Sequence, residues 1–156
     1  NGAVVDRDEV HDAFHTSLFE DFRTRLQEIP GTSELLQTLR DNDQLISIAS
    51  SGSRERVTLG ITTTGANQYF KDSIITTAED AKRGKPFPDL FLITAERAGI
   101  DPRNCLVIED SPFGIEAASH AGMSSIGLAY RTPAEKLSAA DLVVRTPKEV
   151  LLALGY

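Results

Sequence analysis

Hydrophobic positions along this chain follow two alternating patterns, one typical of helices and one typical of buried strands. Over residues 6–27 apolar side chains recur every four positions, which predicts an amphipathic helix. Further helical patterns cover residues 32–40, 54–64, 88–98, 112–120 and the segment from 147 onward. Short apolar runs separate them at residues 45–49, 72–76, 106–108, 125–128 and 141–144. Strands that alternate with helices predict an α/β fold with a parallel sheet.

Polar residues follow several of these predicted strands. The run at 106–108 is continuous rather than alternating, so we expect a strand that is buried on both faces. In a parallel α/β sheet, functional groups gather at the carboxyl ends of the strands. Ser50, Lys85 and the pair Glu109–Asp110 all fall at or just beyond such ends. We therefore expect these groups to converge at one edge of the sheet.

The types of these residues suit phosphoryl chemistry, and each also has a plainer interpretation. Lys85 stands in a stiff Gly/Pro loop and could neutralise phosphate oxygens, or it could be a solvated loop lysine. Glu109 and Asp110 could hold a divalent cation, or cap the helix that follows them. The Ser-Ser-Gly-Ser string at 50–53 could cradle a phosphate, or form an ordinary turn with one serine as helix cap.

Composition narrows the range of partners. The 156 residues are 40% hydrophobic, which is enough for the core of one domain. The formal net charge of −7 argues against binding of nucleic acid or an anionic membrane, so a phosphate site must be locally basic or metal-loaded. Cys105 is the one cysteine, which excludes an internal disulfide and fits a reducing, cytoplasmic location. No apolar stretch is long enough to span a membrane.

Three ordered motifs carry a resemblance to a known family. They read Gly-Lys-Pro-Phe-Pro-Asp-Leu-Phe at 84–91, Ile-Glu-Asp-Ser-Pro-Phe-Gly-Ile-Glu-Ala-Ala at 108–118 and Ala-Gly-Met at 121–123. With them, residues 29–156 resemble the haloacid dehalogenase-like (HAD) hydrolases, in the branch of β-phosphoglucomutase and phosphoglycolate phosphatase. The resemblance implies a three-layer α/β/α Rossmann-like core over residues 29–156. Residues 1–28 are similar to the last part of the helical cap of that family.

The resemblance also implies roles for individual residues. Ser50 would bond the transferring phosphoryl group, helped by the backbone of Ser51 and Gly52. Lys85 would balance charge between the phosphoryl group and the nucleophile. Asp110 would be a direct Mg²⁺ ligand, and Glu109 would support the metal directly or through water.

The family's nucleophile motif is the point at which this chain departs from the pattern. That motif is an apolar strand ending in Asp-x-Asp, well upstream of the Pro-Gly pair found here at residues 30–31. We therefore expect the first strand and most of the cap to be missing from this sequence. Residues 3–10 formally fit the motif, with Asp6 as nucleophile and Asp8 as acid/base, yet Asp6 and Glu9 also fit a helix capping pair. Without that central strand, its two neighbours would leave buried backbone groups unpaired, at about 1–3 kcal/mol each.

These observations together predict an enzyme. We expect a magnesium-dependent phosphatase-type hydrolase of a small phosphorylated metabolite, which acts through an aspartyl-phosphate. One alternative is a β-phosphoglucomutase-like mutase. Another is a catalytically inactive fragment or an interaction module that pairs through the vacant strand position. We expect a monomer or homodimer, and the substrate is not set by this sequence because cap residues usually select it in this family.

Overall fold

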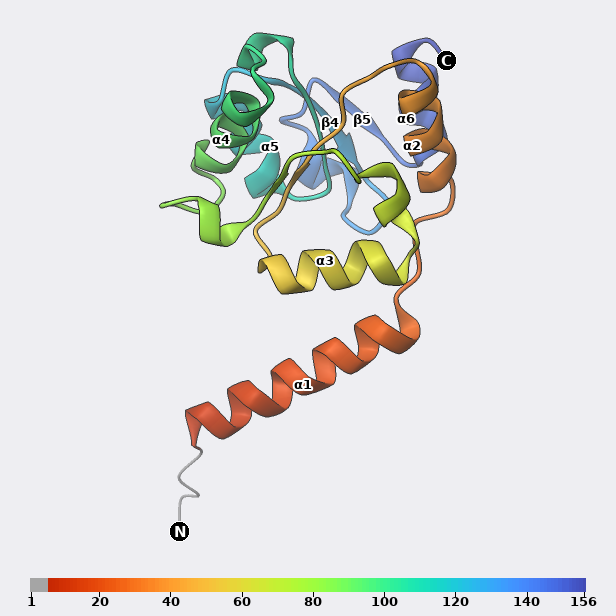
Figure 1. The fold of residues 1–156 in the computed structure, drawn as a ribbon. Helices are drawn as coiled ribbons and strands as arrows, with labels where there is room; N and C mark the ends of the chain where they lie inside the picture. The colour runs from red at the N-terminus through yellow and green to blue at the C-terminus, as the bar shows by residue number, and fades with distance from the viewer. Residues whose placement is uncertain (1–5) are drawn as a thin grey trace.

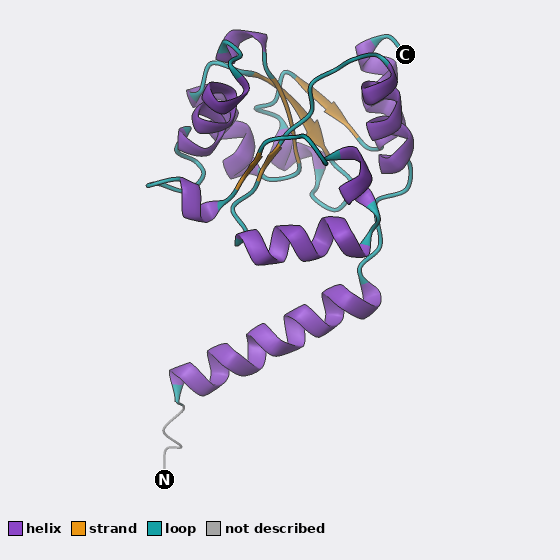
Figure 2. Cartoon of the chain, in the orientation of Figure 1, coloured by secondary structure: helices purple, strands orange, loops and turns teal. Residues whose placement is uncertain are grey.

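The part of the chain that the structure describes contains six α-helices, five short strands and four short 3-10 helices, with helices between most successive strands (Figures 1 and 2). The structure is a computed structural model, and it describes the backbone of residues 6–156 and the side chains of Asp6 and residues 16–156. The α-helices are α1 (Arg7–Arg25), α2 (Thr32–Asp41), α3 (Arg54–Thr63), α4 (Asp89–Ala98), α5 (Pro112–His120) and α6 (Pro147–Leu154). The strands are β1 (Ile48–Ala49), β2 (Ile75–Thr76), β3 (Leu106–Glu109), β4 (Ser124–Leu128) and β5 (Leu142–Val144).

All of these strands pair in parallel, as the alternation of strand and helix predicts. They form two separate sheets, one in the order β1-β2 and the other in the order β3-β4-β5. Among the described residues no backbone ladder joins β1, which leads to Ser50, to β3, which ends at Glu109, so the sheet is divided between these two strands. This is the position at which the sequence predicts a gap if the family's first strand is missing.

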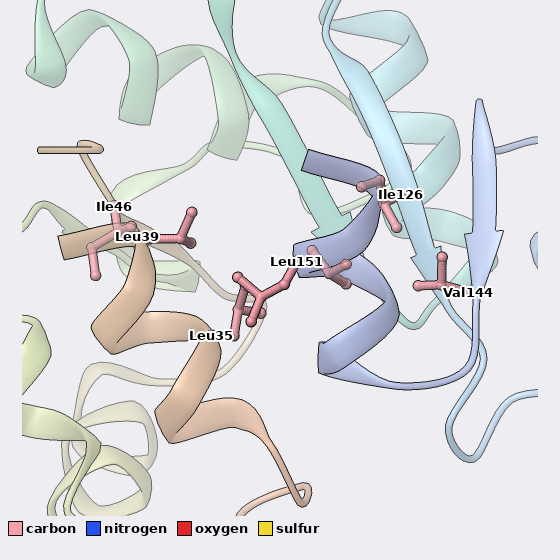
Figure 3. Packing of buried hydrophobic residues seen from close by; sticks show 7 residues of the cluster. Leu35, Leu39, Ile46, Ile126, Val144 and Leu151 are labelled. Carbon is pink, nitrogen blue, oxygen red and sulfur yellow. The ribbon is translucent and has the colours of Figure 1, made fainter. Parts of the chain in front are cut away.

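Helices cover both faces of the strands. On one face, α2 and α6 pack Leu35, Leu39 and Leu151 against Ile126 of β4 and Val144 of β5 (Figure 3). On the other face, α4 and α5 pack against Val107 of β3 in a second cluster, which comprises Phe91, Ala95, Val107, Ala117, Ala118, Ala121 and Met123. This arrangement is an α/β/α core of the Rossmann-like kind, as expected.

Strand β3 differs from its prediction. Val107 is buried against α4 and α5, whereas its neighbours Leu106 and Ile108 are 41% and 37% exposed. Because successive side chains of a strand point to opposite faces, Leu106 and Ile108 share the face opposite Val107. The expectation that this strand is buried on both faces is therefore wrong. Ile108 lies opposite Ile126 of β4, on the face that α2 and α6 cover over β4 and β5, but that cover leaves Leu106 and Ile108 of β3 partly exposed.

Helix α1 lies outside the α/β body. It contacts α3, and its beginning is the part of the helix farthest from the strands (Figure 1). Phe22 and Leu26, near its end, face a cleft toward α3. The assignment of residues 1–28 to a cap stays a prediction. Within the described residues, none of the helices has the length and apolar character required to cross a bilayer.

Candidate active site

A pocket of about 590 Å³ opens between the carboxyl ends of β1 and β3. It lies where the two sheets are not paired, so the groups that follow each strand face a common space. The expected convergence of Ser50, Lys85 and the Glu109–Asp110 pair is found here. The lining residues are Ile29, Ala49, Ser50, Ser51, Gly52, Arg56, Lys85, Ile108, Glu109, Asp110, Ser111, Phe113 and Leu128.

The loop after β1 supplies hydroxyl and amide groups. The Ser50 amide continues the β1–β2 ladder by donating to the Thr76 carbonyl at 2.9 Å. The Ser50 Oγ accepts a hydrogen bond from the Gly52 amide at 3.1 Å, which closes the turn tightly. Ser53 Oγ accepts from the Arg56 amide and so caps α3. The plainer interpretation of this string is thus correct for Ser53, while Ser50, Ser51 and Gly52 line the pocket.

Lys85 is not a solvated loop lysine. Its side chain is only 10% exposed and forms an ion pair with Glu109. Its Nζ also donates to the Ala49 carbonyl at 3.2 Å, at the end of β1. The ring of Phe91, buried on α4, lies with its centroid 4.7 Å from the same nitrogen. Lys85 therefore places a positive charge at the base of the pocket, in contact with both sheets.

Contacts on both sides of Lys85 hold its loop. Arg83 forms a two-point ion pair with Asp89, at 3.1 and 2.7 Å, and lies over the ring of Phe87. The hydrogen bonds from Arg83 lower the pKa of the Asp89 carboxyl. On the other side, the Nδ1 atom of His120 is 3.1 Å from the Pro86 carbonyl. Local ion pairing thus fixes the loop that the sequence already stiffens with two prolines.

Glu109 and Asp110 take different positions at the end of β3. The Glu109 carboxylate pairs with Lys85 and accepts the amides of Asp110 and Ser111, both at 3.1 Å. Glu109 therefore caps the start of α5 and neutralises Lys85 at the same time. The capping alternative is thus correct for Glu109. Asp110 is exposed and lines the pocket, and its carboxylate takes no part in these hydrogen bonds.

A magnesium ion would fit this donor set only with water as additional ligands. Within the described residues no group of three or more acidic, histidine or cysteine side chains is arranged to hold a metal. Asp110 offers an accessible carboxylate, and Glu109 is already bound to a lysine and two amides. Magnesium commonly binds through one or two carboxylates plus phosphate oxygens and water. Asp110 is thus the residue best placed to hold it.

The two N-terminal aspartates are not brought to this pocket. Asp6 is exposed and directly precedes α1, whose beginning points away from the strands (Figure 1). Asp8 belongs to the first turn of α1, and residues 3–5, which would form the strand of an Asp-x-Asp motif, lie outside the described residues. The roles of Asp6 as nucleophile and Asp8 as acid/base stay predictions, and in this arrangement α1 would have to move for Asp6 to reach the pocket.

Several lining residues were not anticipated as site residues from the sequence, among them Phe113 and Arg56. Phe113 follows the helix-starting proline of α5 and is 62% exposed at the pocket. Arg56, in the first turn of α3, lines both this pocket and an adjoining cleft of about 320 Å³ between α1 and α3. The charged string at the start of α3 is a pattern common on solvated helices, so periodicity alone does not mark Arg56 as a site residue.

Comparisons with known proteins agree with this fold. The haloacid dehalogenase-like hydrolase family matches residues 4–128. Validoxylamine A 7'-phosphate phosphatase of Streptomyces hygroscopicus subsp. limoneus is 34% identical over 122 residues, which cover 78% of this chain and 56% of the relative. A HAD family hydrolase of Deinococcus radiodurans, solved with bound phosphate and sodium, aligns with a TM-score of 0.80 and 30% identity over 94% of this chain and 65% of that one. β-Phosphoglucomutase of Clostridium difficile aligns with a TM-score of 0.76 and 29% identity, and the alignment covers 91% of this chain and 60% of that one.

The chain spans only part of the curated relatives that it matches. The matched regions cover 56%, 36% and 31% of the length of three of them. Each of the three bears a phosphatase name, and their substrates differ.

Proposed function

Because the chain belongs to the haloacid dehalogenase-like hydrolases, we propose that its pocket binds and helps to hydrolyse the phosphate ester of a small metabolite. The main support for the proposal is that Lys85, the Ser50–Gly52 loop and Asp110, which come from three separate segments, line the same pocket. A buried lysine, a hydroxyl and backbone amides together suit the oxygens of a phosphoryl group. The family to which the chain is similar supports the same reading, since curated relatives across several substrates are named phosphatases.

We assign roles to the pocket residues on that basis. Ser50 Oγ and the Ser51 amide would bond the phosphoryl oxygens, joined by the Gly52 amide once it leaves Ser50 Oγ, and Lys85 would offset their charge. Asp110 would hold Mg²⁺, which when bound supplies charge neutralisation for the phosphoryl group. Glu109 acts by holding Lys85 in place and by orienting the loop that carries Asp110.

The proposed reaction needs a carboxylate nucleophile. In the proposed mechanism an aspartate attacks phosphorus and releases the alcohol, and water then cleaves the aspartyl-phosphate. The pocket-lining carboxylates, Glu109 and Asp110, have the roles given above, so Asp6 is the candidate within this sequence. Residues 1–28 would then be a short N-terminal segment that brings Asp6 to the pocket, and not the remnant of a helical cap.

Turnover of p-nitrophenyl phosphate tests the proposal. We expect magnesium-dependent release of p-nitrophenol that stops with excess EDTA. Replacing Lys85 by Met should lower kcat by about 10²–10³, because one electrostatic contact to the transferring group is lost. Asp110→Asn should raise the magnesium concentration required for half-maximal activity. Asp41→Asn, which changes an exposed acid at the end of α2, is the matched control and should retain full activity.

The outcome for Asp6→Asn locates the nucleophile. Loss of turnover with retained phosphate binding would identify Asp6 as the attacking group. Full turnover in Asp6→Asn would contradict that role. A folded wild-type chain that binds neither magnesium nor inorganic phosphate would contradict the proposal itself and favour the interaction-module alternative. Binding without turnover would retain the phosphate site and reject hydrolysis by this chain alone.

A further inference from the structure

Arg56 occupies an unusual position beside the phosphate-binding loop. Its guanidinium lies against Gly52, so a Cβ atom at residue 52 would be 2.7 Å from the nearer terminal nitrogen of Arg56. Gly52 itself is buried and does not have a positive φ. The absence of a side chain at residue 52 therefore serves the close approach of this guanidinium rather than a special backbone conformation.

Arg56 also differs from the other arginines in its partners. Arg54, Arg83 and Arg97 each form an ion pair with an aspartate, and so do the two exposed arginines at residues 25 and 103. Within the described side chains, the arginines that lack an ion pair are Arg23, Arg40, Arg56, Arg131 and Arg145, and of these only Arg56 is half-buried. No hydrogen bond joins its guanidinium to another described residue. A permanently charged group that is half-buried without an anion costs solvation free energy, which a bound anion would recover.

The charge balance of the pocket points in the same direction. The charge of Lys85 is already offset by Glu109, to which it is bound at the base of the pocket. The other lining carboxylate, Asp110, is assigned to Mg²⁺ in the proposed function, so Arg56 is the lining cation that is left without a bound anion. Because Arg56 lines both the pocket and the adjoining cleft toward α1, it lies at their junction and not at the base beside Lys85.

We infer that Arg56 binds a second anionic group of the substrate, and that this site takes phosphate esters that also carry a carboxylate or a further phosphate. The inference rests on the proposed function, because it assumes that the ester phosphate occupies the Ser50–Gly52 loop. A guanidinium presents a planar pair of N–H donors that matches either anion in a two-point contact. Gly52 permits that contact by leaving the space above the loop to the guanidinium.

Equilibrium binding of three non-hydrolysable probes tests the inference without any need for turnover. Methylphosphonate carries one anionic group, phosphonoacetate adds a carboxylate, and methylenebisphosphonate adds a second phosphonate. Titration calorimetry with magnesium in large excess gives the three dissociation constants for each variant. Since a hydrogen-bonded charged pair contributes about 1.5–3 kcal/mol, the wild type should bind at least one two-anion probe about tenfold to hundredfold more tightly than methylphosphonate.

Variants of Arg56 supply the decisive comparison. Arg56→Gln should abolish the preference and leave the affinity for methylphosphonate within about twofold, and Arg56→Lys should keep part of the preference because the charge remains. Arg103→Gln removes an equal charge at the start of β3, at the opposite end of that strand from the pocket, and should keep the full preference. Thermal unfolding of each variant confirms that it is folded.

Each outcome separates the inference from the proposed function. Tight binding of phosphonoacetate alone, or of methylenebisphosphonate alone, would identify the second group as carboxylate or phosphate. Binding of methylphosphonate with no preference in the wild type, or with a preference that survives in Arg56→Gln, would overturn the inference and leave the phosphate site intact. Failure of the folded wild type to bind inorganic phosphate or any probe would overturn both.

Discussion

At the scale of single residues, the position of Glu109 depends on the absence of a side chain at residue 114. The Glu109 carboxylate lies so close to the Cα atom of Gly114 that a Cβ atom there would overlap it. Gly114 belongs to the first turn of α5, which Glu109 caps, and is itself buried. The glycine in the Ser-Pro-Phe-Gly string therefore serves to admit the carboxylate that pairs with Lys85.

This close approach yields a stability prediction. Gly114→Ala should displace Glu109 from Lys85 and from the two amides, and should destabilise the fold by about 1–3 kcal/mol despite the better helix propensity of alanine. Gly84→Ala is the matched control, because a Cβ atom at residue 84 would meet nothing within 4 Å. Urea unfolding of both variants measures the difference. An unfolding midpoint of Gly114→Ala equal to that of wild type would show that Glu109 relaxes without cost.

At the scale of elements, one carboxylate ties together three segments around β2. Asp80 accepts hydrogen bonds from the Thr77 amide at 2.8 Å, from Arg54 of α3 at 2.7 Å and from Arg97 of α4 at 2.7 Å. The Thr77 amide, followed by Arg97, holds the pKa of Asp80 at about 2, below its ordinary value of 3.8. The carboxylate is therefore ionised in the fold throughout the neutral range, and its bonds help to orient α3 and α4 on either side of the β1–β2 pair.

The depressed pKa of Asp80 predicts how stability depends on pH. A carboxyl with a lower pKa in the folded state contributes stability above pH 3.8, and that contribution is lost as the pH falls toward about 2. The difference in urea midpoint between wild type and Asp80→Asn should thus be largest near neutral pH and shrink over this acid range. A difference that stays constant between these pH values would contradict the role given to the ionised carboxylate.

At the scale of the whole molecule, Lys85 joins two sheets that have no backbone ladder between them. Its Nζ bonds the Ala49 carbonyl at the end of β1 and the Glu109 carboxylate at the end of β3. Both charged side chains are about 10% exposed, so their attraction is little screened by solvent. The same lysine that we propose for phosphate binding is therefore also a structural link across the division between the sheets.

A double-mutant cycle tests that link. Lys85→Met leaves the Glu109 carboxylate without its cation and should destabilise the fold by about 3–5 kcal/mol, because a buried charge has lost its partner. Glu109→Gln combined with Lys85→Met should recover part of this loss, giving a coupling energy of about 1–3 kcal/mol. Urea unfolding of the two single variants and the double variant supplies the cycle. Additive effects of the two substitutions would mean that the pair does not hold β1 and β3 together.

The local pattern of the chain was enough to predict most elements and the residues at their ends. The helix boundaries at Gly99 and His120 agree with the pattern, and so do the parallel pairing and the placement of Ser50 directly after β1. Lys85 lies in the loop before α4, several residues beyond the end of β2. The reason is that hydrophobic periodicity, glycine and proline influence the backbone over only a few residues, so each helix or strand can be recognised from its own segment of the sequence. The family motifs around Lys85 and Asp110 likewise consist of residues adjacent in the chain.

Other features were decided only by the tertiary structure, because they depend on residues that are distant in the sequence. The exposure of Ile108 follows from what covers its face of the strand, and an apolar run alone does not contain that information. The ion pair of Lys85 with Glu109 and the position of Arg56 over Gly52 depend on how β1, β3 and α3 meet. Local patterns in the chain were therefore sufficient for the elements, the family and the main pocket residues, whereas the packing of distant segments sets which charges are paired and leaves Arg56 without a bound anion.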